Sequence, residues 1–211
     1  MVVIFSAPLN LITDKNFYKF EILNRNNFYL KLSINIFFHL NFFLIFSFLE
    51  IDLKQILFFL IFFSIILNTY YLYGAKIKYN YSFIIYSLIV LAIFFKIAAE
   101  PKLEWDGLNH WIAKALIFFN GTNISDIKNH GMAEYPHLGP YIWSFFWKNS
   151  LLQYEYLGRL FYAFFYVTCI FYFIEDFFKK NNIALIIIIL FTCIITYDHF
   201  LFGGYQEYLI F

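Results

Sequence analysis

Long apolar runs dominate this chain, and they predict helices. Three of them cover residues 32–49, 55–73 and 81–99, and two more cover residues 160–174 and 183–202. A helix that crosses the roughly 30 Å hydrocarbon core of a bilayer needs about 20 predominantly apolar residues, and these runs are of about that size. The pattern therefore predicts an all-α, polytopic membrane protein with about five transmembrane helices.

The composition agrees with a membrane protein and excludes a nucleic-acid-binding protein. The 211 residues are 62% hydrophobic and only 14% charged, with a mean hydropathy of +0.67, which is too apolar for an ordinary soluble domain. The formal net charge is +1, so the chain has no positive field that would attract nucleic acid. We expect a multi-pass location, in a bacterial inner membrane, with the lipid bilayer as a partner and no nucleic acid.

Polar segments divide the chain into four parts. Residues 1–31 form a cytoplasmic lead-in, residues 32–99 three transmembrane helices, and residues 100–152 an outer loop with amphipathic interfacial helices. Residues 153–211 hold two further helices and the start of a truncated one, which indicates a fragment of a longer protein. Within the loop, residues 138–152 are short and interrupted, and we predict an interfacial or partly inserted helix there.

The distribution of lysines orients these parts. Short cytoplasmic loops carry an excess of Lys and Arg, which places Lys76 and Lys179 inside if residues 138–152 do not cross the bilayer. The loop then lies outside, and Asp106 and Glu207 emerge on the same outer face. If residues 138–152 do cross, Glu207 lies on the opposite face.

The outer loop holds most of the polar chemistry. From residue 106 to residue 119, apolar side chains recur at spacings of three and four, which predicts an amphipathic helix along the membrane surface. Asp106, His110 and Lys114 follow each other at intervals of four and share one stripe of that helix. One interpretation is a solvated face. The other is a site in which Asp106 acts as a general base and Lys114 faces an anionic phosphate.

Two further groups of residues allow alternative interpretations. One group consists of His130, Glu134 and His137. These are either ordinary polar residues of a loop or ligands of a divalent metal, although their spacing matches no sharp ligand motif. The other group is Glu155 and Arg159, which are four residues apart. This spacing is typical of an ion pair on a helix. Alternatively, Arg159 holds a lipid phosphate through its fork of donors.

The order of the loop motifs resembles the GT-C superfamily of integral membrane glycosyltransferases, in particular bacterial relatives of protein O-mannosyltransferases and of the lipid A aminoarabinose transferase. The likeness covers residues 105–211. It is carried by Trp105-Asp106, Trp111, Lys114-Ala115, the segment Tyr-Pro-His-Leu-Gly-Pro at 135–140, Glu155, Arg159, and Gly-Tyr-Gln-Glu at 204–207.

The resemblance implies an activity, the partners of the reaction and the residues of the site. It implies transfer of a sugar from a polyprenyl-phosphate donor to a lipid or glycan acceptor of the cell envelope, at the outer face of the membrane. Asp106 and Glu207 match the two acidic positions of the family, although many relatives carry Asp at the second. The residues expected to bind the substrates are Lys114, Arg159, His110, Tyr135 and His137.

Other functions fit the same sequence. A transporter or scaffold without catalysis is one, but its polar groups would be expected inside the spans, which carry few. An inactive truncated fragment is another. The sequence defines no cofactor, and a divalent metal at the loop stays open.

Overall fold

The computed structural model describes residues 28–72, 81–121, 124–129, 133–178 and 187, and within them every regular element is a helix. The all-α fold class is therefore confirmed. The helices are α2 (Phe28–Phe48), α3 (Leu53–Leu72), α4 (Tyr81–Ala99), the π-helix η2 (Gly107–Trp111), α5 (Ile112–Phe119), α6 (Ile124–Ile127), α7 (Leu138–Lys148) and α8 (Glu155–Phe178).

Helices α2, α3 and α4 coincide with the first three apolar runs, and α8 contains the fourth. The fifth run, residues 183–202, lies outside the described residues except for residue 187, and Glu207 lies outside them entirely. In the described part of the chain, no helix combines the length and the apolar character that a membrane crossing requires.

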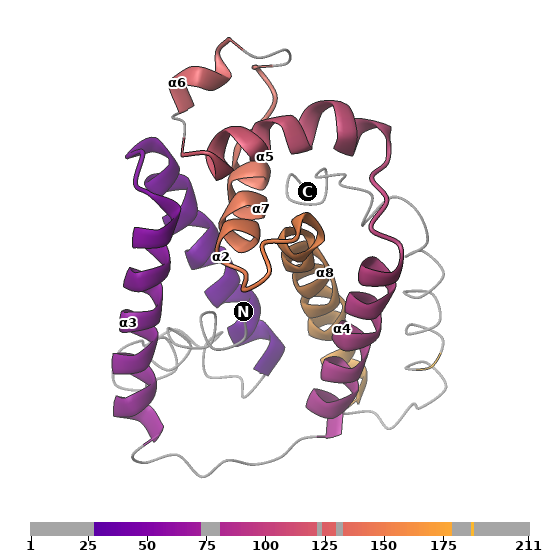
Figure 1. Ribbon diagram of the computed structural model, residues 1–211. Coiled ribbons are helices and arrows are strands. Elements are labelled where there is room, and N and C mark those ends of the chain that lie inside the picture. The colour runs from indigo at the N-terminus through magenta and orange to yellow at the C-terminus, as the bar shows by residue number, and fades with distance from the viewer. Residues whose placement is uncertain (1–27, 73–80, 122–123, 130–132, 179–186, 188–211) are drawn as a thin grey trace.

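The long helices and the loop segments lie at defined positions relative to each other. Figure 1 shows α2 and α3 as an antiparallel hairpin, while η2 and α5 run across the top of the view from the end of α4 toward the turn between α2 and α3. We call the end of the structure formed by residues 49–52, 100–121, 124–129 and 133–137 the loop end. Contacts tie it together, because Ser47 lies 3.3 Å from His137 and Asn149 donates to the carbonyl of Leu53.

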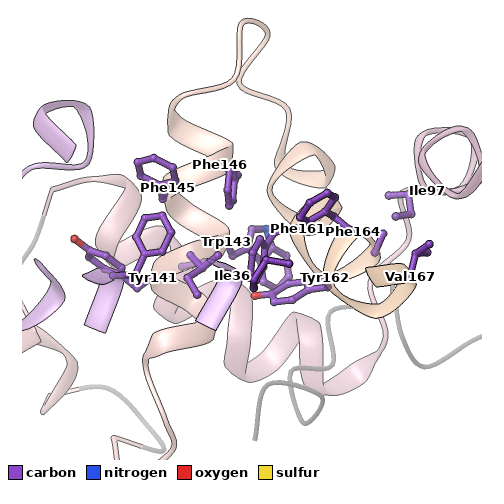
Figure 2. Close-up of a cluster of buried hydrophobic side chains, with 14 of the residues drawn as sticks. Ile36, Ile97, Tyr141, Trp143, Phe145, Phe146, Phe161, Tyr162, Phe164 and Val167 are labelled. Atoms are coloured by element: carbon purple, nitrogen blue, oxygen red, sulfur yellow. The ribbon is translucent and has the colours of Figure 1, made fainter. Parts of the chain in front are cut away.

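Helix α7 lies in the core of the structure. Its 11 residues extend about 16 Å, and all side chains from Gly139 to Phe146 are buried. Figure 2 shows its aromatic side chains packed with those of α8, and the rings of Phe146 and Phe161 stack 5.5 Å apart. The interfacial or partly inserted helix predicted at residues 138–152 is thus a helix that other helices bury, because α2, α5 and α8 cover α7 from several sides.

The long helices expose large apolar side chains, and their mainly apolar core also contains several polar side chains. The outward faces of α2, α3 and α4 carry large apolar side chains that are 60–74% exposed: Phe37, Phe58, Phe62, Leu88 and Phe95. Several polar side chains are instead buried between the helices: Asn35, His39, Ser47, Ser64 and Thr168. Soluble proteins rarely expose apolar surface on this scale.

Candidate functional site

The predicted helix at residues 106–119 is interrupted by a π-helical turn. The backbone N–H of Ile112 bonds to the carbonyl of Gly107, five residues earlier, and α5 continues from there. Such a turn holds one more residue than an α-helical turn, so the side chains on its two sides lose their common register. Asp106, His110 and Lys114 therefore do not form the continuous stripe that a uniform α-helix would give.

The face that this segment buries agrees with the predicted one at Trp111 and Ala115 and differs from it elsewhere. Leu108 and Leu116, expected on the apolar face, are exposed, whereas Lys114 is fully buried. The buried face is formed by Gly107, Trp111, Lys114, Ala115 and Phe118. The extra residue of the π turn rotates the helix, and packing against α7 decides which face points inward. The interpretation of Lys114 as part of a solvated face is wrong.

Lys114 instead holds the segment that precedes α7. Its ammonium group donates to the backbone carbonyl of Tyr135 at 2.9 Å and lies 5.7–5.9 Å from the ring centroids of Tyr135 and Trp111. Burial lowers the pKa of Lys114, and the negative charge of Glu134 partly opposes this shift. A buried ammonium needs such partners, so Lys114 fixes residues 134 and 135 against α5.

An aromatic contact places His110 beside Tyr135, whose carbonyl accepts the Lys114 hydrogen bond. The His110 ring lies between Trp105, at 5.3 Å edge to face, and Tyr135, at 6.2 Å and nearly parallel. His137 follows two residues after Tyr135. Burial and the positive charge of Lys114 lower the pKa of His137, which favours its neutral imidazole. Three predicted substrate-binding residues, His110, Lys114 and Tyr135, thus form one cluster at the loop end. The His137 ring lies against Ser47, Phe48 and Phe118 instead.

Asp106 lies at the edge of this cluster. It directly follows Trp105, whose ring contacts His110, and its side chain is partly exposed. The carboxylate makes no capping hydrogen bond to the π-helix that begins after it. A carboxylate that is accessible and not committed to a cap can accept a proton from a bound molecule, as the predicted role of general base requires.

Arg159 lies apart from the cluster and is buried. Its guanidinium pairs with Glu155, with Nε 2.9 Å from Oε1, and donates to the backbone carbonyls of Pro101 and Lys102. The interpretation as an ion pair between positions i and i+4 is confirmed. A lipid phosphate would have to displace these partners. Arg159 therefore positions the chain that leads from α4 to Asp106.

Two variants of Lys114 separate what its charge and what its volume contribute to the free energy of unfolding. Lys114→Met keeps the buried stem and removes a desolvated charge, so we expect a change in the free energy of unfolding within about 1 kcal/mol. Lys114→Ala leaves a cavity and costs about 3 kcal/mol. Unfolding of the detergent-solubilised protein, followed by far-UV circular dichroism, measures both. Equal losses for the two variants would mean that the ammonium, not the stem, supplies the stabilisation.

The same variants carry a pH signature. A lysine whose pKa is lower in the folded than in the unfolded state makes stability rise with pH, up to its ordinary pKa of about 10.5. We expect this rise in the native protein and its loss in Lys114→Met.

The predicted metal site and the second carboxylate, Glu207, lie partly or wholly outside the described residues. Within the described ranges no group of three His, Cys, Asp or Glu side chains is placed to hold a metal ion, and His130 lies outside them. Glu207 is outside them as well. The sequence patterns did not single out Trp111 as a ring beside the lysine, because its apolar spacing marks it as a core residue. Comparison with protein-family models, with curated proteins and with solved structures found no match.

Proposed function

We propose that this protein is a polytopic membrane glycosyltransferase that moves a sugar from a polyprenyl-phosphate donor to a lipid or glycan acceptor at the outer face of a membrane. The observation that carries the proposal is the position of Asp106. It directly follows Trp105, whose ring contacts His110, at one end of a set of helices whose outward faces are apolar.

The outward faces support the membrane part of the proposal. Phe58 and Phe62 on α3 and Phe95 on α4 project strongly apolar surface away from the protein, which lipid chains would cover at no cost. Buried polar residues such as Asn35 and His39 are what helices in a bilayer keep inside. In this proposal the spans are the apolar runs at residues 32–49, 55–73, 81–99, 160–174 and 183–202, although no helix of the described residues reaches the length and hydropathy of a crossing.

The loop end then lies at the depth of the lipid headgroups. A polyprenyl-phosphate donor presents its phosphate and sugar at this depth, while its chain stays among the lipids. Trp105 and Tyr135 are both exposed at the loop end, where aromatic side chains with a polar edge favour the interface. In this proposal the donor sugar and a membrane-bound acceptor meet at the Asp106 carboxylate.

In the proposed reaction, the Asp106 carboxylate takes the proton of an acceptor hydroxyl. The acceptor oxygen forms a bond to the anomeric carbon from the side opposite the phosphate. The bond between that carbon and the phosphate oxygen breaks, and polyprenyl phosphate leaves with the electron pair. The products are a glycoside of inverted configuration and a protonated carboxyl that returns its proton to water.

Lys114 and Arg159 act in this proposal as positioning residues. Lys114 fixes Tyr135 beside His110, and its positive charge favours an anionic group near the cluster. Arg159 fixes residues 101 and 102, at the start of the segment that carries Asp106. His110 and the exposed face of Tyr135 are left to contact the substrates.

Asp106→Asn tests the proposal. Amide replacement keeps the shape of the side chain and removes its basicity, so we expect transfer to fall at least 100-fold, as is typical for loss of a general base. The full chain is reconstituted in lipid nanodiscs with envelope extract as acceptor and a panel of synthetic polyprenyl-phosphate hexoses and pentoses. Mass spectrometry measures the polyprenyl phosphate that is released.

Glu100→Gln is the matched control, because Glu100 is an exposed carboxylate in the same loop. We expect it to keep the activity of the native protein. Membrane insertion and the circular dichroism spectrum should be the same for both variants. Release that is independent of Asp106, or no release with any donor of the panel, would contradict the proposal.

A further inference from the structure

A small cavity at the loop end lies apart from the Asp106 cluster. It has a volume of about 90 Å³ and is enclosed by the turn between α2 and α3 and by α5, α6 and α7. Its floor consists of buried side chains, among them Ser47, Phe118 and Tyr141, and its mouth consists of the exposed residues Glu50, Asp52 and Gly121. This volume holds about three water molecules, or a group of four or five non-hydrogen atoms.

Tyr141 lines the cavity, and its buried hydroxyl lacks a partner among the described residues. The side chain is 3% exposed, and its hydroxyl makes no hydrogen bond to any atom in the described part of the protein. A buried hydroxyl without a partner is costly, and most such groups in folded proteins are satisfied. The edge of the Tyr141 ring packs on Phe118 at 5.0 Å, so this aromatic wall is held in place.

The charges around the cavity are predominantly negative. Glu50 and Asp52 are its two charged lining residues. Lys148 lies 3.6 Å from one Asp52 oxygen and balances one of these charges, while the other oxygen accepts the backbone N–H of Lys54. One negative charge remains at the mouth of a cavity whose walls are two aromatic rings, an arrangement that favours a cation.

We infer that this cavity binds a small primary ammonium group, with the carboxylates of Glu50 and Asp52 at its mouth and the Tyr141 hydroxyl at its floor. An ammonium group offers three N–H donors and no acceptor. The cavity provides acceptors for them in the two carboxylates and in the oxygens of Tyr141 and Ser47. The volume admits an alkylammonium of ethanolamine size. This inference does not depend on glycosyl transfer.

Ethanolammonium chloride serves as the probe. The full chain in detergent is titrated calorimetrically and by thermal unfolding, with sodium chloride at equal ionic strength and glycerol as comparisons. We expect saturable binding and an upward shift of the unfolding temperature with ethanolammonium only. Equal shifts with sodium chloride or with glycerol would overturn the inference, because the cavity would then hold water or any polar molecule.

Tyr141→Phe is the sharpest variant, because it removes one unpaired hydroxyl and leaves the packing intact. We expect its unfolding temperature without ligand to equal or exceed that of the native protein, and its affinity for ethanolammonium to fall about tenfold. Glu50→Gln should weaken binding similarly. Asp126→Asn, at an exposed carboxylate on α6 that does not line the cavity, is the control and should bind as the native protein does. Unchanged affinity in Tyr141→Phe would overturn the inference.

The natural source of the ammonium is a lipid headgroup or a soluble amine, and nanodiscs distinguish the two. If the headgroup is the source, the native protein unfolds at a higher temperature in phosphatidylethanolamine than in phosphatidylglycerol, and Tyr141→Phe removes the difference. If a soluble amine is the source, free ethanolammonium stabilises the native protein equally in both lipids. Both results support the inference, whereas no stabilisation in any lipid or by the free amine contradicts it.

Discussion

Replacing Gly158 by alanine is expected to destabilise the protein by about 3 kcal/mol. A methyl group at this position would lie 2.5 Å from the backbone carbonyl of Trp143 and closer still to its indole ring. The backbone of α7 cannot retreat without disturbing the aromatic core that α7 and α8 share (Figure 2). Alanine is favoured over glycine inside a helix by about 1 kcal/mol, so a loss must come from this contact.

Gly121→Ala is the matched control. Gly121 has a φ of +81°, so alanine is strained there, but its nearest neighbour is the flexible Lys148 ammonium at 3.9 Å. We expect a cost of about 1 kcal/mol from the backbone alone. Unfolding in detergent, followed by far-UV circular dichroism, compares the two variants. A Gly158→Ala variant as stable as the native protein would show that α7 and α8 do not approach as closely as described.

Arg159→Met is expected to cost about 3–5 kcal/mol. Arg159 is buried, and its loss leaves the Glu155 carboxylate without the charge that offsets its desolvation. The carbonyls of Pro101 and Lys102 lose donors as well, but both residues are exposed and water can replace them. The penalty therefore comes mainly from Glu155. The double variant Arg159→Met with Glu155→Gln should recover most of the loss, measured as a double-mutant cycle in the same assay.

The pH dependence provides a second readout of this pair. Burial raises the pKa of Glu155, and Arg159 opposes that shift, so removing Arg159 raises the pKa further. A carboxyl whose pKa is raised in the folded state makes stability fall as pH rises through that value. The cost of Arg159→Met should therefore shrink as pH is lowered toward the ordinary carboxyl pKa. A cost that is the same at every pH, or no recovery in the double variant, would contradict a penalty that originates at Glu155.

Lys114 illustrates where the sequence was sufficient and where it was not. Its place on a helix followed from the apolar spacing around it, and α5 is indeed a helix. The side of the helix on which Lys114 lies did not follow from the sequence. It depends on a π turn, which is set by backbone hydrogen bonds that no residue pattern predicts. The contact with the carbonyl of Tyr135 joins residues that are 21 positions apart, and only packing brings them together.

Helix α7 illustrates the same limit for burial. Its Trp and Lys residues are typical of an interfacial helix, and its 11 residues agree with the prediction that it is short. Its burial depends on α8, where Gly158 permits close approach, and on α5, whose Ala115 carbonyl accepts the Ser144 hydroxyl. None of these partners is adjacent in sequence.

The sequence by itself determined the all-α class, the position of the helices α2, α3 and α4 and the concentration of polar residues in the loop, because these depend on local composition and on helical periodicity. The tertiary structure decided which of those polar residues meet. It joined His110, Lys114 and Tyr135, paired Arg159 with Glu155, and formed the cavity that Glu50 and Asp52 line. These outcomes depend on contacts between distant segments, whose free energies are fixed only when the helices pack.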